Sequence, residues 1–74
     1  MTAPRADAPN LRPRQRECLF WVSQGKSSVD IGRMLSLSPR TVDEHVRGAC
    51  RSLGVRTRVQ AVARAVALGL INPT

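Results

Sequence analysis

The sequence is poor in the residues that build metal sites. It has two cysteines, Cys18 and Cys50, and a single histidine, His45. The cysteines do not form a close pair, and one histidine adds too little to complete a tetrahedral metal site. Both cysteines fall among apolar positions of predicted helices, so we interpret them as small core hydrophobes rather than as a disulfide. We therefore expect no metal and no other cofactor.

The sequence also lacks long apolar runs. No stretch approaches the length of a transmembrane helix, and residues 1–10 lack the apolar centre of a secretory signal peptide. We expect residues 1–10 to form a flexible N-terminal arm. Residues 11–71 should then form the domain and residues 72–74 a short tail.

Motifs for catalysis are missing too. Gly25-Lys26-Ser27-Ser28 imitates the end of a phosphate-binding loop, but the full motif needs another glycine where this chain has Phe20. There is no Gly-x-Ser-x-Gly elbow and no carboxylate pair in a plausible pocket. His45 lies at the edge of the buried side of a predicted helix, where we expect it to pack. In a chain that makes only one small domain, these absences argue against an enzyme.

What the sequence has in excess is arginine. Eleven of the twelve basic residues are arginine, Lys26 being the exception, and the formal net charge is +7. A small basic domain suggests a polyanionic partner, and the planar guanidinium pairs well with phosphate and with guanine edges. Solubility together with a genome-wide compositional bias would explain the charge as well. Charge alone therefore does not decide between the two interpretations.

Helix signals predict an all-α fold of four helices. Pro13 suits the first turn of one helix, Ser38 caps another with Pro39 at its first position, and Thr57 with Gln60 forms a capping box. Glycines favour helix ends at Gly25, Gly54 and Gly69. The predicted helices cover about residues 13–24, 28–36, 39–53 and 58–68.

The second and third predicted helices form a helix-turn-helix pattern over about residues 27–46, with a short break at 36–38. At about 100° per residue, the third helix has an apolar side and a charged side. The apolar side carries Val42, Val46, Ala49 and Leu53. The charged side carries Arg40, Asp43, Glu44, Arg47 and Arg51. An ordinary solvated face would explain the charged side, but not the short break or the charge of the chain.

The fourth predicted helix is apolar on two sides. We expect the core side to carry Val59, Val62, Ala63 and Val66, and the other side to carry Ala61, Ala65 and Leu68. A second apolar side can pack against a second subunit, although alanine is also simply a good helix former. In the second helix, the expected apolar contacts come from Val29, Ile31, Met34 and Leu35.

The sequence resembles the LuxR/GerE-type helix-turn-helix domain over residues 11–71. The segments that carry the resemblance are Leu11-Arg-Pro-Arg14, Gln24-Gly25-Lys26-Ser27-Ser28, Arg40-Thr41-Val42, His45-Val46, Leu53-Gly54-Val55 and Gln60-Ala61-Val62-Ala63. Their succession is highly specific. Trp21 together with Gly25-Lys26-Ser27-Ser28 leans toward the quorum-sensing branch.

The resemblance implies a DNA-reading helix at 39–53 and dimerisation through the fourth helix. It implies base contacts from Asp43, Glu44 and Arg47. It implies phosphate contacts from Ser28, Arg40, Thr41 and Arg51. The implied dimer contacts are Ala61, Arg64, Ala65 and Leu68.

The chain departs from the family pattern in three ways. Arg12 and Gln15 replace the usual threonine and glutamate of a capping box, which could cost about 1 kcal/mol. Asp43 and Glu44 are acidic where lysine or neutral residues are common, so they either accept from cytosine or weaken non-specific binding. The sensing or receiver domain that usually precedes this domain is replaced by the arm, so the chain is either an excised domain or a stand-alone regulator.

We expect a dimeric, sequence-specific DNA-binding regulator of transcription, located in the cytoplasm in association with the nucleoid. The alternative is an interaction module that pairs with a full-length LuxR-type relative and inhibits it. Besides double-stranded DNA, RNA polymerase is a further possible partner. No membrane partner is expected.

Overall fold

The computed structural model describes residues 10–73, which contain four helices and no strand. The helices are α1 (Pro13–Ser23), α2 (Ser28–Leu35), α3 (Pro39–Leu53) and α4 (Arg58–Ala67). The all-α fold is confirmed, and no predicted helix end differs from the structure by more than one residue. The predicted arm falls almost entirely on residues 1–9, outside the described residues.

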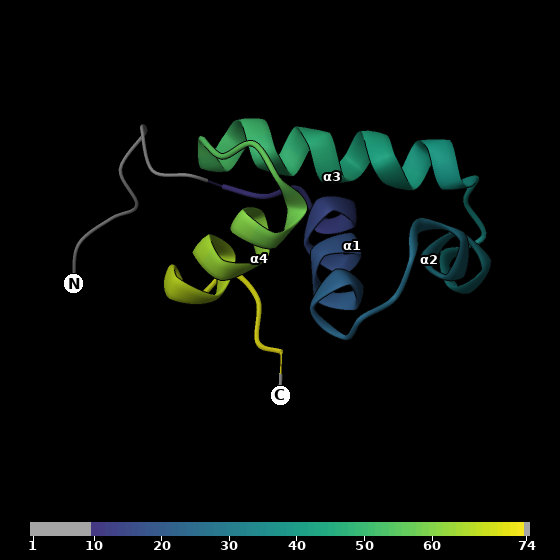
Figure 1. Ribbon diagram of the computed structural model, residues 1–74, viewed down its shortest axis with the longest axis horizontal. Helices are drawn as coiled ribbons and strands as arrows, with labels where there is room; N and C mark the ends of the chain where they lie inside the picture. Colours follow the sequence, from purple (N-terminus) through teal and green to yellow (C-terminus); the bar gives the residue numbers. More distant parts are fainter. Residues whose placement is uncertain (1–9, 74) are drawn as a thin grey trace.

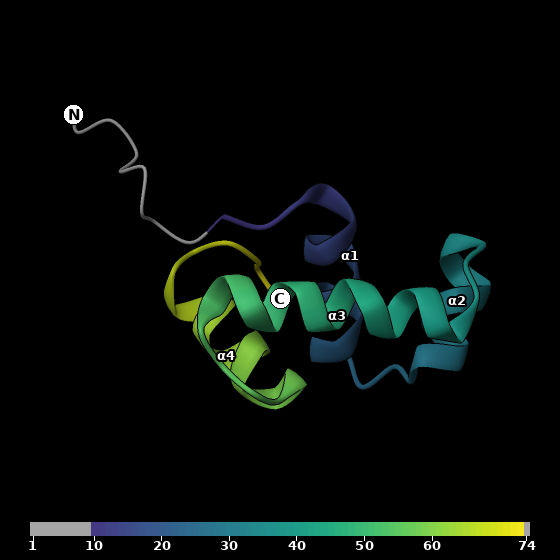
Figure 2. The same ribbon diagram turned by 90° about the horizontal axis from the view of Figure 1, so that it is seen from above.

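The longest helix, α3, lies across the molecule and contacts the other three (Figure 1). Seen from above, α1 crosses beneath the middle of α3, α2 lies beside its N-terminal end, and α4 lies beside its C-terminal half (Figure 2). α1 and α4 also pack against each other. One side of α3 is therefore covered along its length, while the opposite side is left to solvent.

Ser38 and Thr57 cap their helices as the sequence predicts, and Ser27 caps α2 in the same way. Ser27 Oγ accepts from the backbone N–H of Asp30 at 3.1 Å, and Ser38 Oγ accepts from that of Thr41 at 3.1 Å. At α4, Thr57 Oγ1 accepts from the backbone N–H of Gln60, also at 3.1 Å. Each bond satisfies a donor that the first turn leaves without an intrahelical partner, so the three helix starts are fixed locally.

The turn between α2 and α3 depends on a close backbone approach. Ser36 ends α2 in the left-handed conformation with φ 58°. A Cβ at Gly32 would lie 2.4 Å from the carbonyl oxygen of Leu37, so only glycine fits without a shift of the backbone. The two helices of the helix-turn-helix therefore meet in one defined geometry.

The start of α1 keeps half of its capping box. Gln15 Oε1 accepts from the backbone N–H of Arg12 at 3.0 Å. The Arg12 guanidinium has no acceptor, so the reciprocal bond is absent. We expected Arg12 and Gln15 together to remove the capping box. Arg12 does remove its own bond, but Gln15 still makes the bond that a glutamate would make at this position, so the expectation is wrong for Gln15. The buried Gln15 side chain also packs over Gly48 of α3, where a Cβ would come within 2.6 Å of Nε2.

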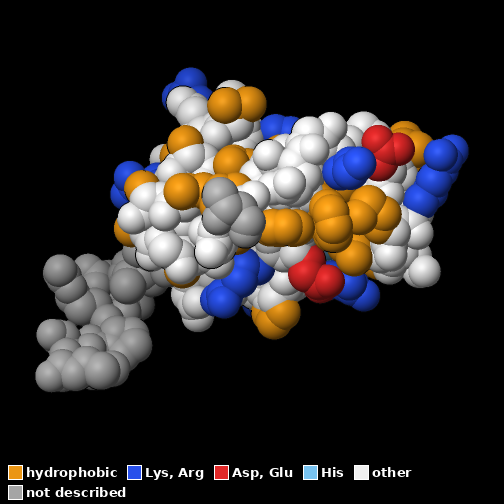
Figure 3. All heavy atoms as spheres, turned by 90° about the horizontal axis from the view of Figure 1, so that it is seen from below, with side chains coloured by type: hydrophobic (Ala, Val, Ile, Leu, Met, Phe, Trp, Pro, Cys, Tyr) orange, Lys and Arg blue, Asp and Glu red, His pale blue; other side chains and the backbone are white. Residues whose placement is uncertain are grey.

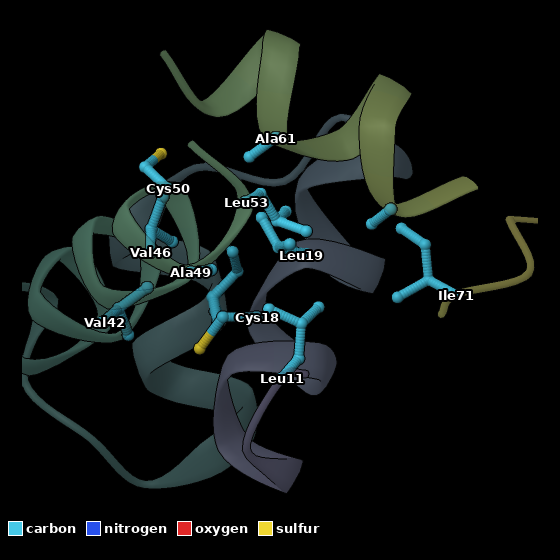
Figure 4. Close-up of a cluster of buried hydrophobic side chains, with 12 residues drawn as sticks. Leu11, Cys18, Leu19, Val42, Val46, Ala49, Cys50, Leu53, Ala61 and Ile71 are labelled. Atoms are coloured by element: carbon cyan, nitrogen blue, oxygen red, sulfur yellow. The ribbon is translucent and has the colours of Figure 1, made fainter. Parts of the chain in front are cut away.

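The core lies where α1, α3 and α4 meet (Figure 4). The predicted inner side of α3 is confirmed, because Val42, Val46, Ala49 and Leu53 are all buried. Cys18 and Cys50 are also buried, with free thiols. Burial raises the pKa of the Cys18 thiol above its ordinary value, and Glu17 adds to the effect. Both cysteines thus serve as small core side chains, as expected.

The predicted faces of α4 are wrong except at Val62, which is partly buried and packs against the core as expected. Ala61 and Ala65 have no exposed surface and belong to the core, whereas Val59 is 74% exposed. Val66 and Leu68 are 40% and 45% exposed, and Ala63 also faces solvent. The small alanines let α4 approach α1 and α3 closely, and the exposed Val59 and Val66 lie outside this contact. Ala61 and Ala65 are therefore unavailable as dimer contacts while the core is intact.

The predicted contacts of α2 are right for only part of the helix. Ile31 is fully buried and Leu35 is partly buried, but Val29 and Met34 are 48% and 43% exposed. α2 lies at the edge of the bundle against α3, so one side of it is covered.

None of the helices in residues 10–73 is long and apolar enough to cross a membrane.

Candidate nucleic-acid interface

The outer side of α3 carries most of the predicted contact residues. Arg40, Glu44, Arg47 and Arg51 are exposed, and Thr41 is partly buried near the N-cap. Ser38 Oγ donates to Thr41 Oγ1 at 2.9 Å in addition to capping the helix. Because the opposite side of α3 is packed into the core, these side chains project from a rigid support.

Three side chains from three helices meet beside this surface. Ser28 Oγ of α2 donates a short hydrogen bond to Asp43 Oδ1 of α3. Arg58 of α4 donates from Nη2 to the same Asp43 oxygen at 3.0 Å and from Nη1 to Ser28 Oγ at 3.1 Å. These three residues form a closed triangle, which we call the Ser28–Asp43–Arg58 cluster.

The cluster keeps the Asp43 carboxylate ionised. The hydrogen bond from Ser28, followed by the hydrogen bond from Arg58, holds the pKa of Asp43 below its ordinary value. The ion pair is partly solvated, since the Arg58 and Asp43 side chains are 37% and 40% exposed. Its main consequence is therefore geometric: it ties α2, α3 and α4 together next to the outer face of α3.

The cluster brings together two residues that were expected to touch DNA separately. Asp43 was a predicted base contact and Ser28 a predicted phosphate contact, but in the structure each already has a partner in the other. Arg58 was not predicted to have a functional role. Its contacts lie 15 and 30 positions away in the sequence, so no local pattern could reveal them.

A charged groove of about 360 Å³ opens between α3 and the segment that leads into α4. It is lined by Asp43, Val46, Arg47, Cys50, Arg51, Val55, Arg56 and Arg58. Four arginines and one aspartate give this lining a formal charge of +3. We call it the arginine groove. Its charge suits an anionic ligand, and it adjoins the outer side of α3.

A second groove, of about 640 Å³, has a different character. It lies between α1 and the C-terminal segment, and its lining includes Phe20, Trp21, Leu70 and Ile71. The Phe20 and Trp21 rings meet edge to face with centroids 4.9 Å apart. Figure 3 views the molecule from the side opposite α3, where hydrophobic side chains gather across the middle of the surface. An anionic partner is therefore favoured on the α3 side.

Across residues 10–73, no group of three or more histidine, cysteine, aspartate or glutamate residues could hold a metal ion. The structure instead shows two helices joined by a three-residue turn, with the second helix exposing an arginine-rich face. This arrangement defines a helix-turn-helix domain.

Comparison with known proteins gives the family. Residues 9–65 match the family model of bacterial regulatory proteins, luxR family, also called GerE. The chain therefore belongs to the LuxR family. It is a LuxR-type DNA-binding domain of a transcription regulator, in a family of regulatory proteins rather than of enzymes. The resemblance drawn from the sequence motifs is confirmed.

Individual relatives agree with this assignment. The chain is 48% identical over 63 residues to the transcriptional activator protein BjaR1 of Bradyrhizobium diazoefficiens, covering 85% of this chain and 26% of that protein. It is 40% identical over 62 residues to the transcriptional activator protein LuxR of Aliivibrio fischeri, covering 84% of this chain and 25% of that protein. The chain thus spans about a quarter of the length of these relatives.

A solved structure confirms the fold. The structure of the transcription factor GerE superposes with a TM-score of 0.82 at 30% sequence identity. The superposition covers 95% of this chain and 100% of that chain. The four-helix arrangement is therefore that of the GerE domain.

Proposed function

We propose that the domain is a sequence-specific regulator of transcription that inserts α3 into the major groove of DNA. The observation that carries the proposal is the division of α3 into a buried side and an arginine-rich exposed side. A major groove about 12 Å wide admits one helix and presents a distinct pattern of donors and acceptors for each base pair. A helix fixed by its inner side can present its outer side to that pattern without losing its position.

Arg47 is the proposed main base reader, because it is exposed near the middle of α3 and its fork can pair with O6 and N7 of guanine. Glu44 is exposed beside it and can accept from the amino group of cytosine. Arg40, Thr41 and Arg51 lie where they can contact phosphates on either side. Asp43, whose Oδ1 already accepts two hydrogen bonds, is more limited as a base reader than Glu44.

The test is selection from a randomised duplex library, followed by affinity measurements on the selected site. Arg47→Ala should lower affinity for that site by about 1–3 kcal/mol and blur the preference at one position. The matched control is Arg16→Ala, which removes the same charge from the lining of the apolar groove. If Arg47→Ala keeps the wild-type preference at every position, α3 is not the reading helix.

The domain is proposed to bind as a dimer through α4, with half-sites about one helical turn apart. Support comes from side chains that project from this helix or its end, since Val59, Val66 and Leu68 are apolar and exposed. Arg64 is exposed on the same helix. Leu68 and Arg64 therefore remain proposed dimer contacts, with Val59 and Val66 in place of Ala61 and Ala65.

Leu68→Glu tests the dimer. It should reduce cooperativity on a duplex with two half-sites and leave helical content unchanged, because Leu68 follows the last residue of α4 and is half-exposed. Val29→Glu, a change of the same kind on α2, should leave cooperativity intact. Wild-type protein that sediments as a monomer on the two-half-site duplex would remove the basis for this part of the proposal.

The exposed side chains of α4 also support the second candidate function, pairing with a full-length LuxR-type relative. An inhibitor of this kind would reduce the DNA affinity of the relative when the two are mixed. A gel shift of the relative, with and without this domain, separates the two functions. Contact with RNA polymerase would come in addition to either of these two functions, and we assign no surface to it.

A further inference from the structure

We propose that the arginine groove binds a phosphate of the DNA backbone, with Arg56 and Arg58 as donors beside the base-reading part of α3. The inference rests on the proposed function and adds a contact site to it. Neither residue is on α3, and neither was predicted from the sequence as a contact. The site would lie where the chain leaves α3 and enters α4.

The position of the groove relative to α3 is the first argument. Its lining includes Arg47 and Arg51, which also belong to the outer face of α3. Sugar-phosphate backbones flank both sides of a major groove, so a helix inserted there meets phosphates on either side. The flank of α3 that faces the start of α4 would meet one of these backbones at the arginine groove.

The second argument is the fixed position of Arg58. Its bonds to Asp43 and Ser28 use one donor on each terminal nitrogen, at 3.0 and 3.1 Å. A guanidinium has more donors than these two, and the side chain is 37% exposed. Arg58 can therefore bind a phosphate while the cluster keeps it in place, so little conformational freedom is lost on binding.

The third argument concerns the backbone beneath Arg56. Gln60 Oε1 accepts from the backbone N–H groups of both Arg56 and Thr57, each at 3.1 Å. These bonds fix the segment that precedes α4, whereas the Arg56 side chain remains exposed. The groove thus has two donors: the Arg58 side chain is held by the Ser28–Asp43–Arg58 cluster, and the Arg56 side chain is attached to a fixed backbone segment.

Asp43 does not prevent anion binding in the groove. Its charge is opposed by Arg58 at 3.0 Å, and the lining keeps a formal charge of +3. In this arrangement Asp43 acts as a positioning residue for Arg58. Arg47 and Arg51, which follow Asp43 at successive turns of α3 in the same lining, are left to face the DNA.

Arg56→Ala is the main test, because Arg56 is exposed and lies outside the Ser28–Asp43–Arg58 cluster. Affinity for the duplex selected from the library is measured over a series of salt concentrations. Each phosphate contact contributes about 0.9 to the slope of log affinity against log salt. We expect the slope of Arg56→Ala to be smaller by about one contact, while Arg16→Ala keeps the wild-type slope. A wild-type slope in Arg56→Ala would overturn the inference.

A second measurement locates the phosphate. The selected duplex is prepared with a neutral methylphosphonate at one backbone position at a time. We expect a methylphosphonate at one flanking position to lower the DNA affinity of the wild-type protein. The same substitution should lower the affinities of Arg56→Ala and Arg58→Lys by less. Equal losses in all three proteins at every position would place the contacts elsewhere. Reduced helical content in Arg58→Lys would leave Arg56→Ala to decide the comparison.

Free phosphate and backbone phosphate are distinguished by competition. Inorganic phosphate added at constant ionic strength should leave wild-type affinity for the duplex unchanged. Competition that disappears in Arg56→Ala would instead show a site for the free anion. If the wild-type domain binds no duplex at all, the proposed function fails. Normal wild-type binding together with an unaltered Arg56→Ala variant rejects only the phosphate site.

Discussion

α3 and α4 both have a buried side and an exposed side, but they distribute apolar side chains differently. α3 buries Val42, Val46 and Leu53 and exposes charged residues, whereas α4 buries Ala61 and Ala65 and exposes larger apolar residues. The branched side chains of α3 fill the space between helices. The alanines of α4 let its backbone come close to α1 and α3, since the distance between helix axes depends on the side chains at the contact.

The difference has consequences for stability and for binding. Buried apolar area stabilises a fold by about 25 cal/mol per Å², so the large inner side chains of α3 should contribute more than the alanines of α4. The exposed apolar side chains of Val59 and Val66, in contrast, should contribute little to the monomer. They are available to a second subunit, while the outer side of α3 is available to DNA.

The largest expected effect is on the inner side of α3. Leu53→Ala should reduce the free energy of unfolding by about 2–5 kcal/mol, because it leaves a cavity in the core. Val59→Ala removes apolar atoms from an exposed position of α4 and should change it by no more than about 0.5 kcal/mol. Urea denaturation of both variants measures the contrast. Similar losses in the two variants would mean that Val59 lies in the core after all.

The next effect tests the close approach of α4. Ala65→Leu adds volume where the side chain has no exposed surface and should reduce the free energy of unfolding by about 1–3 kcal/mol. Ala63→Leu is the same change two positions away on the same helix, at an exposed site. It should be neutral to within about 0.5 kcal/mol. If Ala63→Leu destabilised the fold more than Ala65→Leu, the faces of α4 expected from the sequence would be right.

The same contrast explains what the sequence could predict. On α3, arginine and glutamate cannot enter a core without partners, so the charged residues mark the outer side and the periodicity is unambiguous. On α4, alanine and valine are both apolar, and expecting the larger residues inside gave the wrong rotation. Only the packing of three helices shows that small side chains were required there.

The candidate site was predictable to a similar extent. The caps at Ser38 and Thr57 are local patterns, so the bounds of α3 and α4 followed from the sequence. The outward arginines of α3 followed from periodicity. The contacts of Arg58 did not, because they join residues that only the folded chain brings together. From the sequence, Asp43 was therefore expected to contact bases freely. In the structure its carboxylate accepts hydrogen bonds from residues of α2 and α4.

The smallest expected effect concerns the polar link between α3 and α4. Because the Asp43 pKa is lowered in the folded protein, its ionised form stabilises the fold above its unfolded pKa of about 3.9. That contribution is lost as pH falls through the lower folded pKa. The ion pair is partly exposed, so its contribution should be no more than about 1 kcal/mol. Asp43→Asn should therefore be slightly less stable than wild type at neutral pH, and the difference should shrink as the solution becomes strongly acidic.

Thermal unfolding of wild type and Asp43→Asn across this pH range measures the difference. Glu44→Gln is the matched control, since Glu44 is the next residue on α3 and makes no ion pair with any residue of 10–73. Arg58→Ala, the change at the α4 end of the same pair, should follow the pH dependence of Asp43→Asn, and combining the two should add little. Independent, additive losses would show that Asp43 and Arg58 stabilise their helices separately rather than through their ion pair.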